Sequence, residues 1–130
     1  MGPIHTKIHT KIRLSNPKNT PPTPLEFTAL VDTGAITLCI PQRIADRLNL
    51  AELEKRQVTT AEGRHIPVPY VGPIQVTFQN RNCFTGALVL GDDILLGAVP
   101  LEDMDLVVNP RLQQVTVNPQ SPSVPSAIVK

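Results

Sequence analysis

The stretch LVDTGA, residues 30–35, is where the sequence first offers a chemically useful group. Asp32 follows an apolar run that is typical of a buried strand, and a hydroxyl residue and a glycine come next. A carboxylate at the end of a buried strand is costly unless it is hydrogen-bonded or used. Asp-Thr-Gly after a strand is also a common turn, in which the Asp and Thr side chains bond nearby amides and the glycine takes a positive φ. The tripeptide alone leaves both interpretations open, a turn and a reactive carboxylate.

The flanking residues favour the reactive carboxylate. Ala35 is small and residues 36–40 are mostly apolar again, so Asp32 is expected on a loop between two buried strands. We expect the Thr33 hydroxyl to lock this loop through a buried hydrogen bond, and Gly34 to let another group approach its backbone closely. Support of this kind preorganises a carboxylate for chemistry.

Strands dominate the rest of the chain. Apolar and polar residues alternate over residues 4–14, and a period of two predicts a strand. Further strands are expected at 25–31, 36–40, 53–60, 65–78, 83–90, 94–96, 106–108 and 115–117. Pro41 is expected to be the first residue of a short helix. Residues 100–106 are expected to form a single helical turn. Many short strands in turn-rich order predict an all-β domain, either closed and barrel-like or a sandwich.

A long hairpin connects the strands expected at 53–60 and 65–78. Its turn comprises Ala61, Glu62, Gly63 and Arg64. Pro67, Pro69 and Pro73 lie on the return arm, which they are expected to confine to a sheet edge or an irregular path. A hairpin that is incompletely paired is free to move.

The chain has 130 residues, so a single domain is expected, here residues 1–118. A chain of this length buries roughly two-thirds of its unfolded surface. Residues 119–130 are rich in proline and are expected to form an extended tail.

Composition excludes several classes of function. The net charge is +1, the sequence shows no basic stripe, and only 3% of residues are aromatic, which argues against a nucleic-acid surface. The first residues have no apolar segment of a signal peptide, and no run approaches the ~20 apolar residues of a membrane span. We therefore expect a cytoplasmic protein without a membrane partner.

Few residues are suited to a disulfide, a metal or a cofactor. Cys39 and Cys83 lie in apolar runs and are expected to be buried thiols, with a disulfide as the less favoured alternative. His5 and His9 share one face of the first strand but lie about 13 Å apart there, so no metal site is expected. No cofactor is expected either.

The sequence VDTGA and the later element Leu95-Leu96-Gly97-Ala98, with the long hairpin between them, resemble the retropepsin-like (retroviral-type, clan AA) aspartic proteases of the bacterial single-domain type. The resemblance covers residues 24–118. It implies a retropepsin (acid protease) fold in which the hairpin is the flap that closes over an extended peptide. It also implies an aspartic endopeptidase, a hydrolase of peptide or protein substrates, in which Asp32 is catalytic.

The resemblance further implies a pair of aspartates that share one proton and activate one water. The chain has a single Asp-Thr-Gly, and its later acids, Asp92, Asp93, Asp103 and Asp105, lack that context. A homodimer with Asp32 of each chain on a two-fold axis would supply the pair. The tail or the strand at 4–14 is then expected at the dimer interface, the alternative being a disordered tail in a monomer.

Two points depart from the family or remain open. Many retroviral members carry a basic residue after the apolar-apolar-Gly element, where this chain has Ala98, so an ion pair near the site is expected to be absent or replaced. The subsites are expected to be walled by Leu30, Ala35, Ile36, Ile66, Val68, Leu96 and Val99. The alternative functions are a non-cleaving peptide-binding or dimerisation module of the same fold, and a small-ligand-binding barrel.

Overall fold

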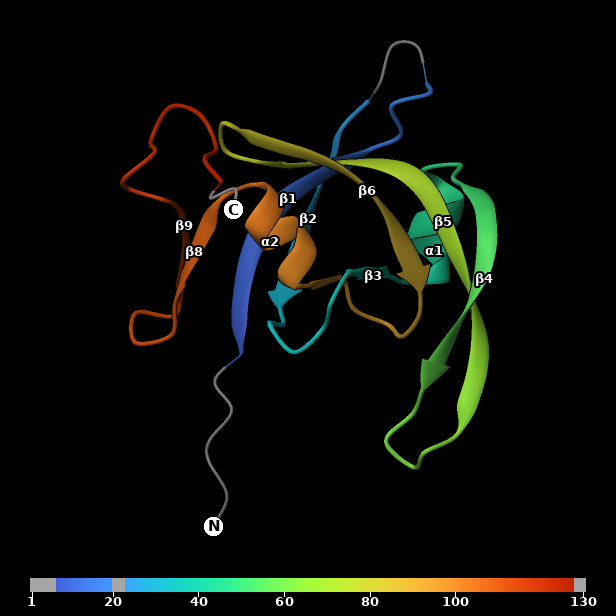
Figure 1. Cartoon of the computed structure of the whole chain (residues 1–130). Helices are drawn as coiled ribbons and strands as arrows, with labels where there is room; N and C mark the ends of the chain where they lie inside the picture. The colour runs from blue at the N-terminus through green and yellow to red at the C-terminus, as the bar shows by residue number, and fades with distance from the viewer. Residues whose placement is uncertain (1–6, 20–22, 128–130) are drawn as a thin grey trace.

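Seven of the nine strands that the structure describes belong to one sheet, and the other two form a separate hairpin. The computed structural model describes residues 7–19 and 23–127. The strands are β1 (Ile8–Ser15), β2 (Leu25–Val31), β3 (Leu38–Ile40), β4 (Ala51–Thr59), β5 (His65–Phe78), β6 (Arg81–Val89), β7 (Leu95–Leu96), β8 (Leu106–Asn109) and β9 (Gln114–Val117). The helices are α1 (Gln42–Arg47) and α2 (Ala98–Asp103), as Figure 1 shows.

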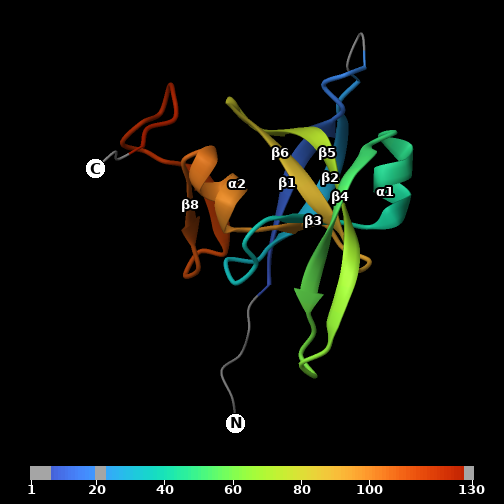
Figure 2. The same ribbon diagram turned by 45° about the vertical axis from the view of Figure 1, so that its right-hand side comes forward.

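The large sheet closes on itself. Its strand order is β1-β2-β7-β3-β6-β5-β4, and β1 also pairs with β5, where Arg13 lies opposite Thr77. The extra pairing closes the ring and leaves β4 outside it, joined to β5. The expected all-β, barrel-like fold is therefore confirmed. The β4–β5 hairpin projects from the ring on the side away from β8 and β9 in both views (Figures 1 and 2).

Alternate side chains of the ring strands point inward and form one core. Ile12 and Leu14 of β1 and Ile74 and Val76 of β5 are at most 1% exposed. Burying one aliphatic side chain stabilises the fold by about 1.5–3 kcal/mol. A slip of one residue in either strand would turn these side chains to solvent, so the core fixes the register.

The strands match the sequence expectation with small shifts at their ends. β2 spans the predicted residues 25–31. β3 is shorter than the predicted 36–40, because the carbonyl of Ile36 accepts a hydrogen bond from the amide of Val99 and not from a strand partner. The start of the first strand at residue 4 falls outside the described residues.

The helices also begin at slightly different residues. α1 begins at Gln42 because Pro41 is its N-cap, so the prediction that Pro41 is the first helical residue is wrong by one position. α2 begins at Ala98 and not at residue 100, since the extended backbone of Gly97 ends β7 directly before it. Neither of these two helices is long or apolar enough to cross a membrane.

The three prolines of the return arm lie at edge or irregular positions, as predicted, although β5 as a whole is not an edge strand. β5 pairs with β4, with β6 and with β1. Pro67 and Pro69 lie where β5 runs beyond the end of β6 and β4 is the neighbour, and Pro73 lies in the bulge between Val71 and Ile74. Each proline therefore occupies a place where its missing N–H interrupts no second ladder.

The C-terminal segment folds back onto its own chain. The Asp105 carboxylate accepts hydrogen bonds from the Ser121 hydroxyl, the Ser126 amide at 2.9 Å and the Asn118 side chain at 3.1 Å. These hydrogen bonds lower the pKa of Asp105, and the bond from Ser121 contributes most. Residues 119–124 consequently form turns and bends, which corrects the expected extended tail over this stretch.

Both cysteines are buried and free, as expected. Burial, together with the charge of Asp103, raises the pKa of Cys83 to about 12. A thiol with so high a pKa stays protonated near neutral pH and is a poor nucleophile.

A stacked group at the base of the β4–β5 hairpin gives a test of the packing. The Tyr70 ring packs against Gly86, where a Cβ would lie 2.3 Å from the ring, and the Arg56 guanidinium lies 3.5 Å from the ring centroid. We expect Gly86→Ala to lower the free energy of unfolding by about 1–3 kcal/mol in a urea titration, because the ring must move. In a Tyr70→Ala background the same change should cost less, and an equal cost in both backgrounds would contradict this packing.

Candidate active site

Asp32 is the first residue after β2, and backbone hydrogen bonds hold it beside β7. The two strands run parallel, with Val31 opposite Leu96. The amide of Asp32 donates to the carbonyl of Leu96 at 3.1 Å. Leu96 is fully buried and the Asp32 side chain is half-buried, so the core anchors the backbone of Asp32 while its carboxylate reaches solvent.

The Asp-Thr-Gly turn orients the carboxylate. The amide of Gly34 donates to Asp32 Oδ1 at 3.0 Å, and the amide of Ala35 donates to the Asp32 carbonyl at 3.1 Å. The group that approaches Gly34 is this carboxylate itself, since a Cβ on Gly34 would lie 3.2 Å from Oδ1. The tripeptide therefore forms a turn, as the first interpretation expects, but without a positive φ at Gly34, and this turn orients the Asp32 carboxylate.

Thr33 departs from the sequence expectation. Its side chain is exposed, and within residues 7–19 and 23–127 its hydroxyl makes no hydrogen bond. The predicted buried hydrogen bond within the loop is therefore wrong for a single chain. Exposed apolar residues lie on the same side of the site, Ile36 with 75% and Val99 with 48% of its surface accessible.

Gly97 locks the active-site loop to the Leu95-Leu96-Gly97 element. A Cβ on Gly97 would lie 2.3 Å from the carbonyl oxygen of Thr37 and 2.7 Å from that of Ala35. The amide of Ala98 donates to the carbonyl of Ala35, and that of Val99 to the carbonyl of Ile36, both at 2.8 Å. Two backbone hydrogen bonds thus join the segments directly after Gly97, where many retroviral members carry a polar side chain and this chain has Ala98.

An open pocket of about 510 Å³ surrounds the carboxylate. It is lined by Asp32, Gly34, Ala35, Ile36, Thr37, Cys39, Gln57, Val58, Thr59, Leu88, Leu90 and Leu95. Among these residues Asp32 is the one carboxylate, and most of the others are apolar. Burial and the negative charge of Asp32 raise the pKa of Cys39, so its thiol stays neutral beside the acid.

The pocket corrects most of the expected subsite residues. Ala35 and Ile36 line it, as expected, but Leu96 and Val68 are buried in the core instead, and Leu30, Ile66 and Val99 do not line it. Sequence reasoning missed Gln57, Val58, Thr59, Leu88 and Leu90. A signal for the two leucines exists in the unbroken apolar run of residues 87–90, since a strand with both faces covered shows no alternation.

The predicted flap turn is a hairpin turn at residues 60–64. The amide of Thr60 donates to the carbonyl of Arg64 at 2.8 Å, and the amide of Gly63 to the carbonyl of Thr60 at 2.9 Å. Gly63 takes the positive φ of 82° that such a turn requires. The other two turn residues, Ala61 and Glu62, are exposed and lie outside the pocket lining, to which the hairpin contributes residues 57–59.

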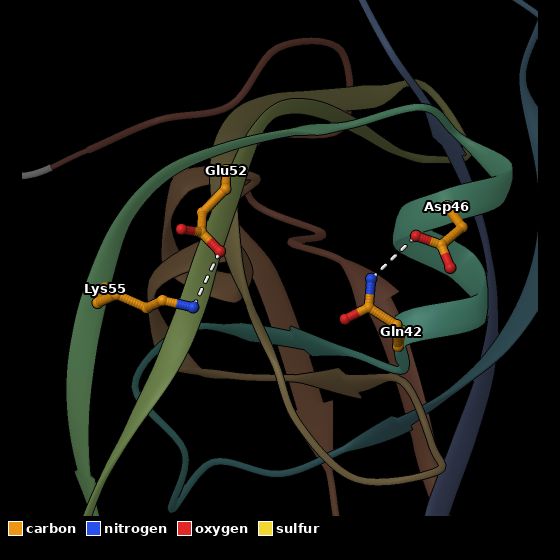
Figure 3. A network of polar contacts seen from close by, with 4 residues as sticks. All are labelled: Gln42, Asp46, Glu52 and Lys55. Carbon is orange, nitrogen blue, oxygen red and sulfur yellow. Dashed lines mark hydrogen bonds and ion pairs between the residues drawn. The ribbon is translucent and has the colours of Figure 1, made fainter.

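Charged side chains cover the base of this hairpin. Glu52 and Lys55 of β4 form an ion pair at 3.1 Å, and on α1 Gln42 donates to Asp46 at 2.9 Å (Figure 3). β4 is the outer strand of the sheet, and charged residues on such a strand discourage further strands from pairing along it. The more apolar stretch nearer the turn is the part that faces the pocket.

The other acids of the sequence are not brought to Asp32. None of Asp92, Asp93, Asp103 and Asp105 lines the pocket, and the Asp105 carboxylate is used by the C-terminal segment. In the part of the chain that the structure describes, no group of three or more His, Cys, Asp or Glu side chains is placed to hold a metal, and His5 lies outside it. Among the described residues, Asp32 is therefore the one carboxylate that lines this pocket.

Substitution of Gly97 tests the contact between the two segments. Because a Cβ would meet backbone atoms that cannot swing away, we expect Gly97→Ala to lower the free energy of unfolding by about 3 kcal/mol or more, measured with urea. Gly63→Ala is the matched control, since a Cβ there meets nothing within 4 Å and costs only the strain of a positive φ, about 1 kcal/mol. Similar losses of unfolding free energy in the two variants would contradict a stabilising role for the close backbone approach at Gly97.

Comparison with known proteins agrees with this geometry. A family model described as "gag-polyprotein putative aspartyl protease" matches residues 24–103, which include the Asp-Thr-Gly turn, the hairpin and Gly97. The solved structure of EIAV protease complexed with the inhibitor HBY-793 has a TM-score of 0.55 and 22% identity, covering 79% of this chain and 92% of that chain, a likeness that shows the fold. No curated protein sequence matches the chain. The chain belongs to the gag-polyprotein aspartyl protease family.

Proposed function

We propose that the protein is an aspartic endopeptidase that works as a homodimer. In this dimer the Asp32 side chains of the two copies together hold one catalytic water. The observation that carries the proposal is the oriented carboxylate of Asp32 in an otherwise uncharged pocket. A turn with a purely structural role would not require a carboxylate that faces the pocket.

Peptide hydrolysis then follows from two facing carboxylates. Like charges this close do not both ionise, so the two copies of Asp32 share one proton. The ionised carboxylate takes a proton from the water, the water oxygen attacks the peptide carbon, and the protonated carboxyl gives its proton to the carbonyl oxygen. When the C–N bond breaks, the leaving nitrogen receives the proton that the first carboxylate took from the water. A hydroxyl of the intermediate returns its proton to the other carboxylate, so the pair again holds one proton as the products depart.

The need for a second copy follows from what one chain lacks. Its pocket holds a single carboxylate, and Thr33, Ile36 and Val99 expose a hydroxyl and two apolar side chains beside it. A two-fold interface brings the same residue of two chains together, so it would supply the second Asp32 and cover this border at once. The hairpin of β8 and β9 adds exposed apolar surface at Val107 and Leu112, which we assign to the same dimer.

The substrate is proposed to be an extended peptide laid along β4. The consecutive residues 57–59 line the pocket, so the backbone of this outer strand runs beside the site and can pair with a peptide strand. Leu88, Leu90 and Leu95 offer apolar walls to the side chains that flank the cut bond. A charged side chain there would lose its hydration without finding a partner.

Substitution of the carboxylate tests the reaction. We expect Asp32→Asn to lower cleavage of a diverse peptide mixture, read by mass spectrometry from pH 4 to 8, by about 10²-fold or more, because the amide cannot act as acid or base. Asp93→Asn, an exposed acid outside the pocket, is the matched control and should cleave normally. Identical products from wild type and Asp32→Asn, with the protein shown to be dimeric, would favour a non-cleaving binding module of this fold.

Mixing the two proteins tests whether a site needs both carboxylates. At constant total concentration and after subunit exchange, an equal mixture of wild type and Asp32→Asn should retain about a quarter of the activity, because only homodimers of wild type carry two acids. A monomeric enzyme would retain about half. Sedimentation at the assay concentration establishes the dimer independently.

A further inference from the structure

One edge of β1 has no paired strand over most of its length, although β9 packs near it. Arg13 to Ser15 pair with β5, but in the part of the chain that the structure describes residues 8–12 pair with β2 alone. The reason is that β5 ends at Phe78, and Gln79 turns away with a φ of 51° toward β6. The backbone groups of β1 that face this side are a ready template for a further strand.

A slot of about 410 Å³ lies beside this open edge. Residues 9–11 of β1 and Thr28 of β2 line it, together with Phe78, Gln79 and Val115. Phe78 and Val115 belong to the core and are at most 9% exposed, so they give the slot an apolar part. A strand added in continuation of β5 would place alternate side chains there.

The outer face of β1 carries a row of basic side chains. Ile8 and Ile12 are buried, so the alternate residues Lys7, His9, Lys11 and Arg13 all face solvent. Successive members of the row lie about 7 Å apart. Glu26 lies 4.0 Å from Lys11, and both side chains are more than 60% exposed, so this pair is weak. The prediction of no basic stripe is therefore wrong for this face, because strand alternation gathers cations that are spread along the sequence.

We propose that this edge binds an extended acidic peptide, which adds to β1 as a strand. In this arrangement the peptide backbone pairs with residues 8–12, its acidic side chains lie across from Lys7, His9 and Lys11, and its alternate apolar side chains enter the slot. The recognised pattern is acidic and apolar residues in alternation. Directly opposite residues on paired strands lie about 4.5–5.5 Å apart, so charges of opposite sign attract each other there.

The open edge favours a peptide over a nucleic acid. Backbone N–H and C=O groups in strand spacing match another peptide strand and have no counterpart in a phosphate chain. Single-stranded nucleic acids are bound through exposed aromatic rings, and the aromatic residue of the slot, Phe78, is 3% exposed and offers no face for stacking. The site is separate from Asp32, whose pocket shares none of the slot residues.

Fluorescence anisotropy with a labelled eight-residue peptide of alternating glutamate and valine tests the proposal. The full chain with Asp32→Asn is used so that the probe is not cleaved, which separates this test from the proposed activity. We expect saturable binding that weakens as salt is raised. The double variant Lys7→Glu/Lys11→Glu should bind about tenfold more weakly, because two attractions become repulsions.

The controls separate a built site from general attraction to a basic protein. Lys18→Glu/Arg111→Glu makes the same change of net charge at exposed residues outside the slot and should bind the probe as the parent does. A probe methylated on alternate backbone nitrogens should bind more weakly, since it cannot complete the ladder. No saturable binding, equal loss in both double variants, or tighter binding of a single-stranded oligonucleotide than of the peptide would each overturn the proposal.

Discussion

The structure depends on the close backbone approach at Gly97. Ala35 and Thr37 come within the space that any side chain on Gly97 would occupy, and the amides of Ala98 and Val99 tie the same loop in place. This contact does three things at once. It ends β7, it starts α2, and it holds the loop that carries Asp32 against the core. A carboxylate that must stay aimed cannot sit on a free loop, and here it is held by main-chain atoms, which have little freedom to move.

The same contact joins the two segments without an ion pair. Backbone hydrogen bonds need no particular side chain at position 98, so alanine is sufficient there. Ile36 and Val99, whose backbone groups make one of these bonds, carry apolar side chains that are exposed. A surface of this kind loses free energy in water and gains it when covered, so the border of the site is itself a driving force for the proposed dimer.

The edges of the sheet divide the molecule into regions with different chemistry. The pairing of β1 with β5 closes the ring of strands. At one end β5 extends beyond β6, and at the other end it stops after pairing with only part of β1. Where it extends beyond β6 it forms the β4–β5 hairpin, and Pro67 and Pro69 interrupt no second ladder there. Where it stops, at Phe78, it leaves residues 8–12 of β1 without a second paired strand, beside the row of basic side chains. Both functional proposals thus arise from one strand whose neighbours do not match its length.

What the sequence by itself determined was local. Alternation over residues 4–14 predicts a strand, Gly63 predicts a turn, and Asp-Thr-Gly after an apolar run predicts an oriented acid, because each depends on neighbours within a few residues. Only the tertiary structure decided which faces met: that Leu88 and Leu90 wall the pocket while Leu96 and Val68 are buried, that Thr33 is exposed, and that Asp105 folds the tail back. These outcomes depend on which strand lies beside which, and on the side of the ring that each residue faces. Period-two patterns do not contain that information, since both faces of a strand can be apolar when each is covered.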